Sequence, residues 1–143
     1  MNKIILSLVG ILVLASCSEP YQVDYDDPEN VLLAYFHYLS NEDYEALVTV
    51  YGGSYELLQG YHADVDPNNY AELFRRYIHI TGGQAVQIKD ILDSKKITDH
   101  EYQYTLTFLH LDGTEFFGGK QYSYTVKRIN GKFLVMEIPP YLA

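Results

Sequence analysis

The sequence is poor in cysteine, tryptophan and basic residues. With one cysteine among 143 residues, no intramolecular disulfide is possible, so a hydrophobic core must hold the fold. Ten lysines and arginines stand against nineteen aspartates and glutamates, which gives a formal net charge of −9. Proteins that bind nucleic acids neutralise phosphates with clustered basic residues, whereas here these residues are sparse and at most paired. We therefore expect no nucleic-acid partner.

The sequence also lacks an apolar run long enough to cross a bilayer, which takes about 20 residues. Its apolar stretch from Ile4 to Val13 is shorter, follows Lys3 and leads directly into Leu14-Ala15-Ser16-Cys17. One positive charge, a short apolar segment and small residues, in this order, are typical of an export signal. We predict that residues 1–16 are a signal peptide and are removed.

The four residues Leu14-Ala15-Ser16-Cys17 resemble the bacterial lipobox, in which small residues precede a lipidated cysteine. The resemblance implies an exported lipoprotein of the cell envelope, anchored in a membrane through several acyl chains such as palmitate on Cys17. Each buried CH₂ of such chains contributes about 0.8 kcal/mol. Ser18 after the cysteine implies the outer membrane rather than the inner one if the cell is Gram-negative. The alternative is an ordinary secretory signal with an incidental cysteine.

The mature chain begins with few apolar residues, so 17–27 is expected to be an acidic tether and 28–143 the folded domain. Asp27-Pro28-Glu29 is typical of a helix start, and the apolar spacing extends this helix to about Ser40. A second short helix is expected between Asn41-Glu42-Asp43 and Gly52-Gly53. Residues 54–64 are ambiguous. Asp66-Pro67 predicts a third helix start, and this helix should end at Gly82-Gly83.

After Gly83, apolar and polar residues alternate, which indicates strands. We predict strands over 85–92, 101–111, 121–129 and 132–138. Tight turns are expected at Asp112-Gly113 and Asn130-Gly131, the second as a type I′ hairpin. A return strand is predicted over 115–117, interrupted at Gly118-Gly119. The fold class is therefore α+β, with N-terminal helices packed on an antiparallel sheet of about four strands.

The helix start at Asp27-Pro28-Glu29, the restart at 41–44 and the closing strands around Asn130-Gly131 resemble small bacterial lipoproteins of the NTF2-like, cystatin-related superfamily. This resemblance implies a cone, in which a curved sheet wraps around the helices and leaves a pocket at its open end. The superfamily contains enzymes, such as isomerases and dehydratases, and also domains without activity. The fold therefore does not decide the function.

Fifteen tyrosines are the most unusual feature of the composition. A tyrosine ring packs on apolar groups while its hydroxyl reaches water or a partner, which suits a ligand pocket or a thinly covered sheet. We predict that the pocket side of the sheet carries the ligand-facing residues, with four tyrosines in a cross-strand ladder. The candidates are Tyr102, Tyr104, Phe108, His110, Tyr122 and Tyr124. Ordinary half-buried packing is the alternative reading.

No catalytic residue, cofactor or metal is predicted. His79 is expected on the solvated side of the third helix, beside Arg75 and Arg76. A calcium loop that starts at Asp64 would need glycine and glutamate at its sixth and twelfth positions, where the chain has Asn69 and Arg75. We expect a domain that binds a small apolar ligand or an envelope protein. The alternative is an envelope enzyme of the isomerase or dehydratase kind, with a buried Asp or His beside tyrosine donors.

Overall fold

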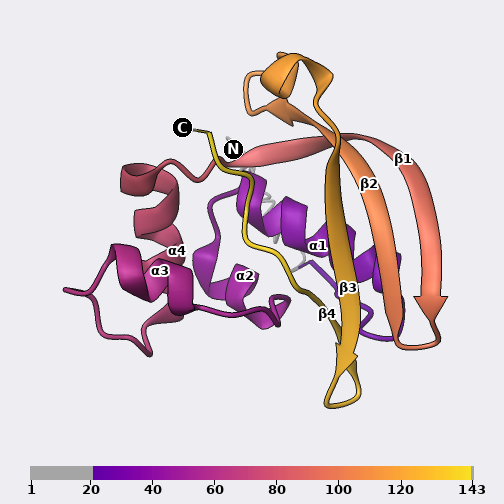
Figure 1. Ribbon diagram of the computed structural model, residues 1–143, viewed down its shortest axis with the longest axis horizontal. Helices are drawn as coiled ribbons and strands as arrows, with labels where there is room; N and C mark the ends of the chain where they lie inside the picture. The colour runs from indigo at the N-terminus through magenta and orange to yellow at the C-terminus, as the bar shows by residue number, and fades with distance from the viewer. Residues whose placement is uncertain (1–20, 143) are drawn as a thin grey trace, which may run out of the picture.

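The computed structural model describes residues 21–142, so the predicted signal peptide and Cys17 lie outside the described residues. Helices come first and a sheet of four antiparallel strands follows, in the order β1-β2-β3-β4 (Figure 1). The predicted α+β class is therefore confirmed. The elements are α1 (Pro28–Ser40), α2 (Tyr44–Thr49), α3 (Glu56–Tyr61), α4 (Tyr70–Arg76), the π-helical turn η1 (Tyr77–Thr81), β1 (Val86–Thr98), β2 (Glu101–His110), the 3₁₀ turn η2 (Phe116–Gly119), β3 (Tyr122–Ile129) and β4 (Lys132–Val135).

Both ends of α1 follow from local sequence. Asp27 is the N-cap, and its Oδ1 accepts from the backbone N–H of Glu29 at 3.0 Å and of Asn30 at 3.3 Å. At the C-terminal end, Glu42 N–H donates to the carbonyl of Leu39 and Asp43 N–H donates to that of Tyr38. These two bonds define a Schellman motif, which favours glycine at the position of Glu42. Glu42 instead holds a φ of +54°.

The prediction that the third helix starts at Asp66-Pro67 was wrong. Asp66 accepts from the backbone N–H of Asn68 and so forms a turn, while Asn69 caps α4 by accepting from Glu72 N–H. Asn69, which favours the N-cap position as Asp66 does, therefore binds the free amides at the start of this helix in place of Asp66. The helix ends near the predicted point, at Gly82, with a φ of +124°.

The sheet differs from the prediction in two ways: the lengths of β1 and β4 differ, and one predicted strand is absent from the described chain. β1 continues to Thr98 because register shifts let its polar second half stay paired with β2. The predicted return strand over 115–117 does not form: Phe117, Gly118 and Gly119 have φ of +47°, +63° and +77°, which a β ladder excludes. The Asn130-Gly131 hairpin is confirmed, with φ of +50° and +82°. β4 ends at Val135, and an irregular C-terminal tail follows.

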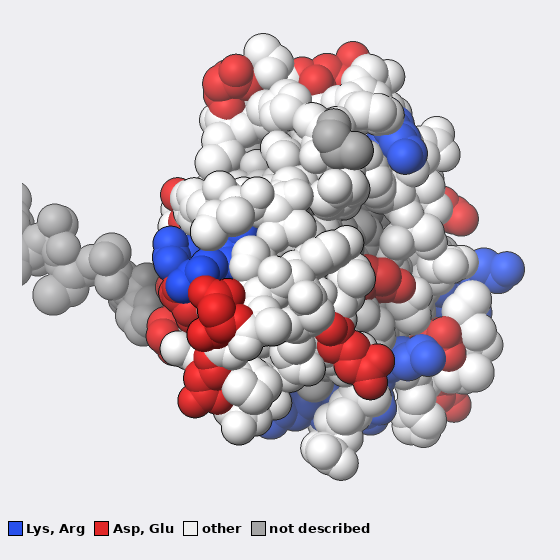
Figure 2. Space-filling view, turned by 60° about the vertical axis from the view of Figure 1, so that its left-hand side comes forward, with Lys and Arg blue, Asp and Glu red and all other residues white. Residues whose placement is uncertain are grey.

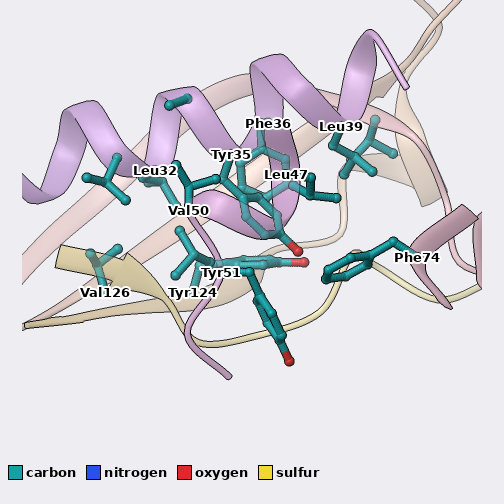
Figure 3. Packing of buried hydrophobic residues seen from close by; sticks show 14 of the residues in the cluster. Leu32, Tyr35, Phe36, Leu39, Leu47, Val50, Tyr51, Phe74, Tyr124 and Val126 are labelled. Carbon is teal, nitrogen blue, oxygen red and sulfur yellow. The ribbon is translucent and has the colours of Figure 1, made fainter. Parts of the chain in front are cut away.

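The hydrophobic core lies between α1 and the concave face of the sheet (Figures 1 and 3). Val31, Leu32, Tyr35 and Phe36 of α1 are between 0% and 2% exposed. The described part of the predicted tether, 21–27, also lies on the domain: the Tyr25 carbonyl accepts from Phe133 N–H at 2.9 Å. The tether prediction missed this contact because single apolar residues among acids give no periodic signal.

Candidate functional site

The six predicted ligand-facing residues fall into two groups. Tyr104, Phe108 and Tyr124 face α1 and are between 0% and 3% exposed, whereas Tyr102, His110 and Tyr122 are half-buried. The predicted ladder is only partly formed. Tyr104 lies opposite Tyr124, but Tyr102 and Tyr122 lie opposite Val126 and Leu106. That these residues face a ligand stays a prediction.

Aromatic rings from α1 fill the concave face of the sheet. The ring of Phe36 lies 4.9 Å from that of Phe108 and 5.0 Å from that of Tyr124. The ring of Tyr35 lies 6.1 Å from that of Tyr124, and Figure 3 shows these side chains pointing toward one another between helix and sheet. Three of the six candidates thus make the core of the domain itself.

Buried tyrosine hydroxyls hold the C-terminal tail, a feature that the sequence analysis missed. Tyr35 donates to the carbonyl of Glu137 at 2.9 Å, Tyr124 donates to that of Ile138 at 2.9 Å, and Tyr77 donates to that of Pro139 at 3.0 Å. Three consecutive carbonyls are thus satisfied by side chains from α1, β3 and η1. We call these three tyrosines the tail clamp. No sequence pattern pointed to it, since its members are 42 and 47 residues apart along the chain.

Removing a hydroxyl of the tail clamp should destabilise the domain. Tyr35→Phe and Tyr124→Phe each leave a carbonyl without its donor, so each should lower the free energy of unfolding by about 1–3 kcal/mol. Urea denaturation followed by circular dichroism measures the effect. Tyr61→Phe, at a position that is 49% exposed, is the matched control and should change nothing. Equal stability of all three variants would contradict the clamp.

A polar groove of about 300 Å³ lies between α2 and α4. At its edge, His79 Nε2 lies 3.1 Å from the Tyr44 hydroxyl oxygen and 3.2 Å from Oε1 of Glu42. Burial raises the pKa of Tyr44, and the nearby Glu42 carboxylate adds to this rise. His79 was predicted to be solvated beside Arg75 and Arg76; it is half-exposed but bonded to Tyr44 and Glu42 instead. The π-helical turn that carries it turns its side chain toward α2.

Some of the remaining charges of the groove are paired, and its lining is acidic overall, with Glu42, Asp43, Glu45 and Glu72 against Arg75. Hydrogen bonds from Arg75 and Arg76 lower the pKa of Glu72 to about 2, with its Oε2 accepting from Arg75 Nε at 2.7 Å. The Asp43 carboxylate caps α2 by accepting from Ala46 N–H. Among residues 21–142, no group of three or more His, Cys, Asp or Glu side chains could hold a metal ion. The groove is therefore an acidic surface cleft in which Glu72 is held by ion pairs.

Two other ionisable groups lie partly inside the domain. His62 is 7% exposed, and its Nε2 lies 2.6 Å from the Thr81 hydroxyl. Glu137 has its pKa raised by burial, and its carboxylate accepts from the backbone N–H of Thr125 at 2.7 Å. Both partners, the Thr81 hydroxyl and the Thr125 N–H, belong to the folded domain itself. In the described chain no tyrosine hydroxyl bonds to the His62 ring or to the Glu137 carboxylate.

Four of the exposed large apolar side chains of the described chain lie on α3, on η1 and in the C-terminal tail. α3 packs on η1, and the ring of Tyr141 covers Gly82 directly after η1. Figure 2 views this side and shows a broad uncharged area with charged residues mostly around its margins. We call it the α3–tail surface. Its members, with their exposed fractions, are Leu57 (52%), Tyr61 (49%), Ile80 (65%) and Tyr141 (50%).

The fold and these surfaces define a small α+β domain whose exposed features are an ion-pair groove and an apolar surface. No protein-family model matches the chain, and no curated protein matches it. A solved crystal structure described as a "Putative NTF2-like transpeptidase" from Campylobacter jejuni is similar to it, with 13% sequence identity and a TM-score of 0.42. The similarity covers 78% of this chain and 98% of that chain. Within residues 21–142, no helix is both long and apolar enough to cross a membrane.

Proposed function

We propose that the chain is a lipid-anchored domain of the bacterial cell envelope that binds a protein partner through the α3–tail surface. The choice of a protein partner rests on one combined observation: side chains fill the interior of the domain, while the four apolar side chains of the α3–tail surface are exposed. Contiguous exposed apolar surface rimmed by polar residues is typical of protein interaction sites. Tyrosine, which supplies two of the four side chains, is also enriched at such interfaces.

The anchor and the envelope address rest on the sequence. The export signal over 1–16 and the lipobox-like Leu14-Ala15-Ser16-Cys17 support lipidation of Cys17. Ser18 supports the outer membrane in a Gram-negative cell. The NTF2-like superfamily is a resemblance from the same sequence and adds no activity to the proposal.

A small apolar ligand is the less supported partner. The apolar hollow between α1 and β1 holds about 170 Å³, whereas ligand pockets typically hold roughly 300–1,000 Å³. The enzyme alternative requires a buried acid or base beside a tyrosine donor. It is less supported, because His62 and Glu137 are bonded to Thr81 and Thr125, and His79, which lies 3.1 Å from the Tyr44 hydroxyl, is half-exposed and not buried.

A photo-crosslinking residue at Ile80 tests the protein partner in the cell that naturally makes this chain. We expect one discrete protein adduct at Ile80 and none when the probe replaces Lys95, an exposed residue of β1. Adding Tyr141→Glu to the Ile80 probe should lower the adduct yield about tenfold, as expected for loss of a contact of ~1–2 kcal/mol.

Two results would contradict the proposal. One is the same adducts from the probes at Ile80 and Lys95, which would indicate random collision. The other is a lack of any adduct at Ile80 together with an apolar molecule that copurifies with the domain in native mass spectrometry. The second result would favour the small-ligand alternative.

A further inference from the structure

We infer that the face of the domain around Tyr21, Leu33 and His37 lies against the lipid bilayer. This inference rests on the proposed lipidation of Cys17 and goes further, because it says which side of the domain the membrane meets. Three observations lead to it: where the described chain begins, how far that point is from the anchor, and which side chains surround it.

The described chain begins on the last turn of α1. The ring of Tyr21 stacks on that of His37, with centroids 4.4 Å apart and planes 20° apart. The same ring meets Tyr38 edge-on at 5.7 Å. The point at which the mature N-terminus reaches the domain is therefore held by two aromatic contacts.

The link between this point and the proposed anchor is short. Cys17 precedes Tyr21 by four positions. A fully extended chain spans at most ~3.5 Å per residue, so the two residues can lie no more than about 14 Å apart. A folded domain is wider than this link, so the side that carries Tyr21 must be the one beside the membrane surface.

The side chains around Tyr21 suit a lipid surface. The hollow between α1 and β1 is lined by Leu33, Phe36, His37, Ser40, Gln87 and Ile88, a set without lysine, arginine, aspartate or glutamate. Leu33 is 41% exposed on the same helix stripe as His37, four positions on. Tyrosine rings are enriched at the membrane–water interface because one end is apolar and the other polar. The chain has a net charge of −9, and Glu29, one turn before Leu33, is exposed. The uncharged hollow therefore approaches lipid at a lower electrostatic cost than the acidic parts of the surface.

Single-tryptophan variants of the full, lipidated chain test the orientation. The chain has no tryptophan, so each introduced residue is its only tryptophan and can be excited selectively, at a wavelength where the tyrosines do not absorb. Leu33→Trp is compared with Leu57→Trp and Leu111→Trp, whose parent residues are 52% and 47% exposed. Each protein is reconstituted in phosphatidylcholine vesicles whose acyl chains are brominated near the headgroup. We expect bromine to quench Leu33→Trp several-fold more strongly than either control.

The outcomes separate this inference from the proposed function. Equal quenching of all three variants, in proteins that sediment with the vesicles, would overturn the orientation and leave the anchor intact. If Cys17→Ala sediments with vesicles just as the parent does, lipid anchoring itself is wrong and the orientation falls with it. Near-identical circular dichroism of the three variants is required, and Leu33→Lys, which should weaken the quenching of a tryptophan placed at Tyr21, provides a second measurement.

Discussion

Raising the pH above about 10 is expected to unfold the domain cooperatively, because several tyrosines titrate only after the chain unfolds. Burial raises the pKa of Tyr35 and of Tyr124 well above the ordinary value, and neighbouring tyrosines add to the rise. Burial likewise raises the pKa of Tyr77 and of Tyr104 to about 12. All four side chains are at most 3% exposed.

The sign of the effect follows from the protons bound in each state. Between pH 10 and the folded pKa, the unfolded chain has lost tyrosine protons that the folded chain keeps, so the free energy of unfolding falls as the pH rises. Each such tyrosine lowers it by about 1.4 kcal/mol per pH unit. Because unfolded tyrosines are only half ionised at pH 10, Tyr77 and Tyr104 together remove roughly 2 kcal/mol between pH 10 and 11, a large share of the ~5–15 kcal/mol of a typical domain. Well below pH 10 these groups leave the stability constant.

Urea denaturation at a series of alkaline pH values measures this slope. Tyr77→Phe should flatten it, whereas Tyr21→Phe, at a site that is 37% exposed, should leave it unchanged. Tyrosinate absorbance should appear together with loss of the circular dichroism signal. Absorbance from the core tyrosines that develops while the protein is still folded would contradict the prediction.

Replacing Phe108 should produce the largest loss of stability from a single substitution in the sheet. The side chain is 0% exposed and its ring lies within 6 Å of those of Phe36, Tyr122 and Tyr124. Phe108→Ala removes the ring from the contact between α1 and the sheet, and the cavity that remains adds to the lost transfer energy. We expect the free energy of unfolding to fall by about 3–5 kcal/mol, as measured by urea denaturation.

Phe117 provides a matched control for this substitution. It is 55% exposed, on the turn η2, and Phe117→Ala should change the stability by less than about 0.5 kcal/mol. If the two alanine variants are equally stable, then Phe108 does not carry the contact between helix and sheet. If Phe108→Ala is as stable as the parent protein, that result would also favour the alternative of a small ligand bound inside the domain.

The parts of the fold that depend on neighbouring residues were predictable. Asp27 and Pro28 start α1 because a capping carboxylate and a residue without an N–H suit the first turn of a helix. Asn130 and Gly131 close β3 on β4 because both accept positive φ. The errors arose where two local signals compete, as between Asp66 and Asn69 for the start of α4.

The sites could be predicted only in part. Alternation placed Tyr104, Phe108 and Tyr124 correctly on one face of the sheet, but it could not tell whether that face meets a ligand or a helix. The groove network of Glu42, Tyr44 and His79 joins α2 to η1, and no spacing in the chain brings these together.

By itself, the sequence determined where α1 begins, where β3 turns into β4, and which side of these elements is apolar, because each depends on residues a few positions apart. The export signal stays a prediction. Only the tertiary structure decided that the rings of α1 occupy the concave face and that three distant tyrosine hydroxyls hold the tail. These contacts depend on how elements far apart in the chain pack, and packing is settled by the shapes and polar groups of all the partners together.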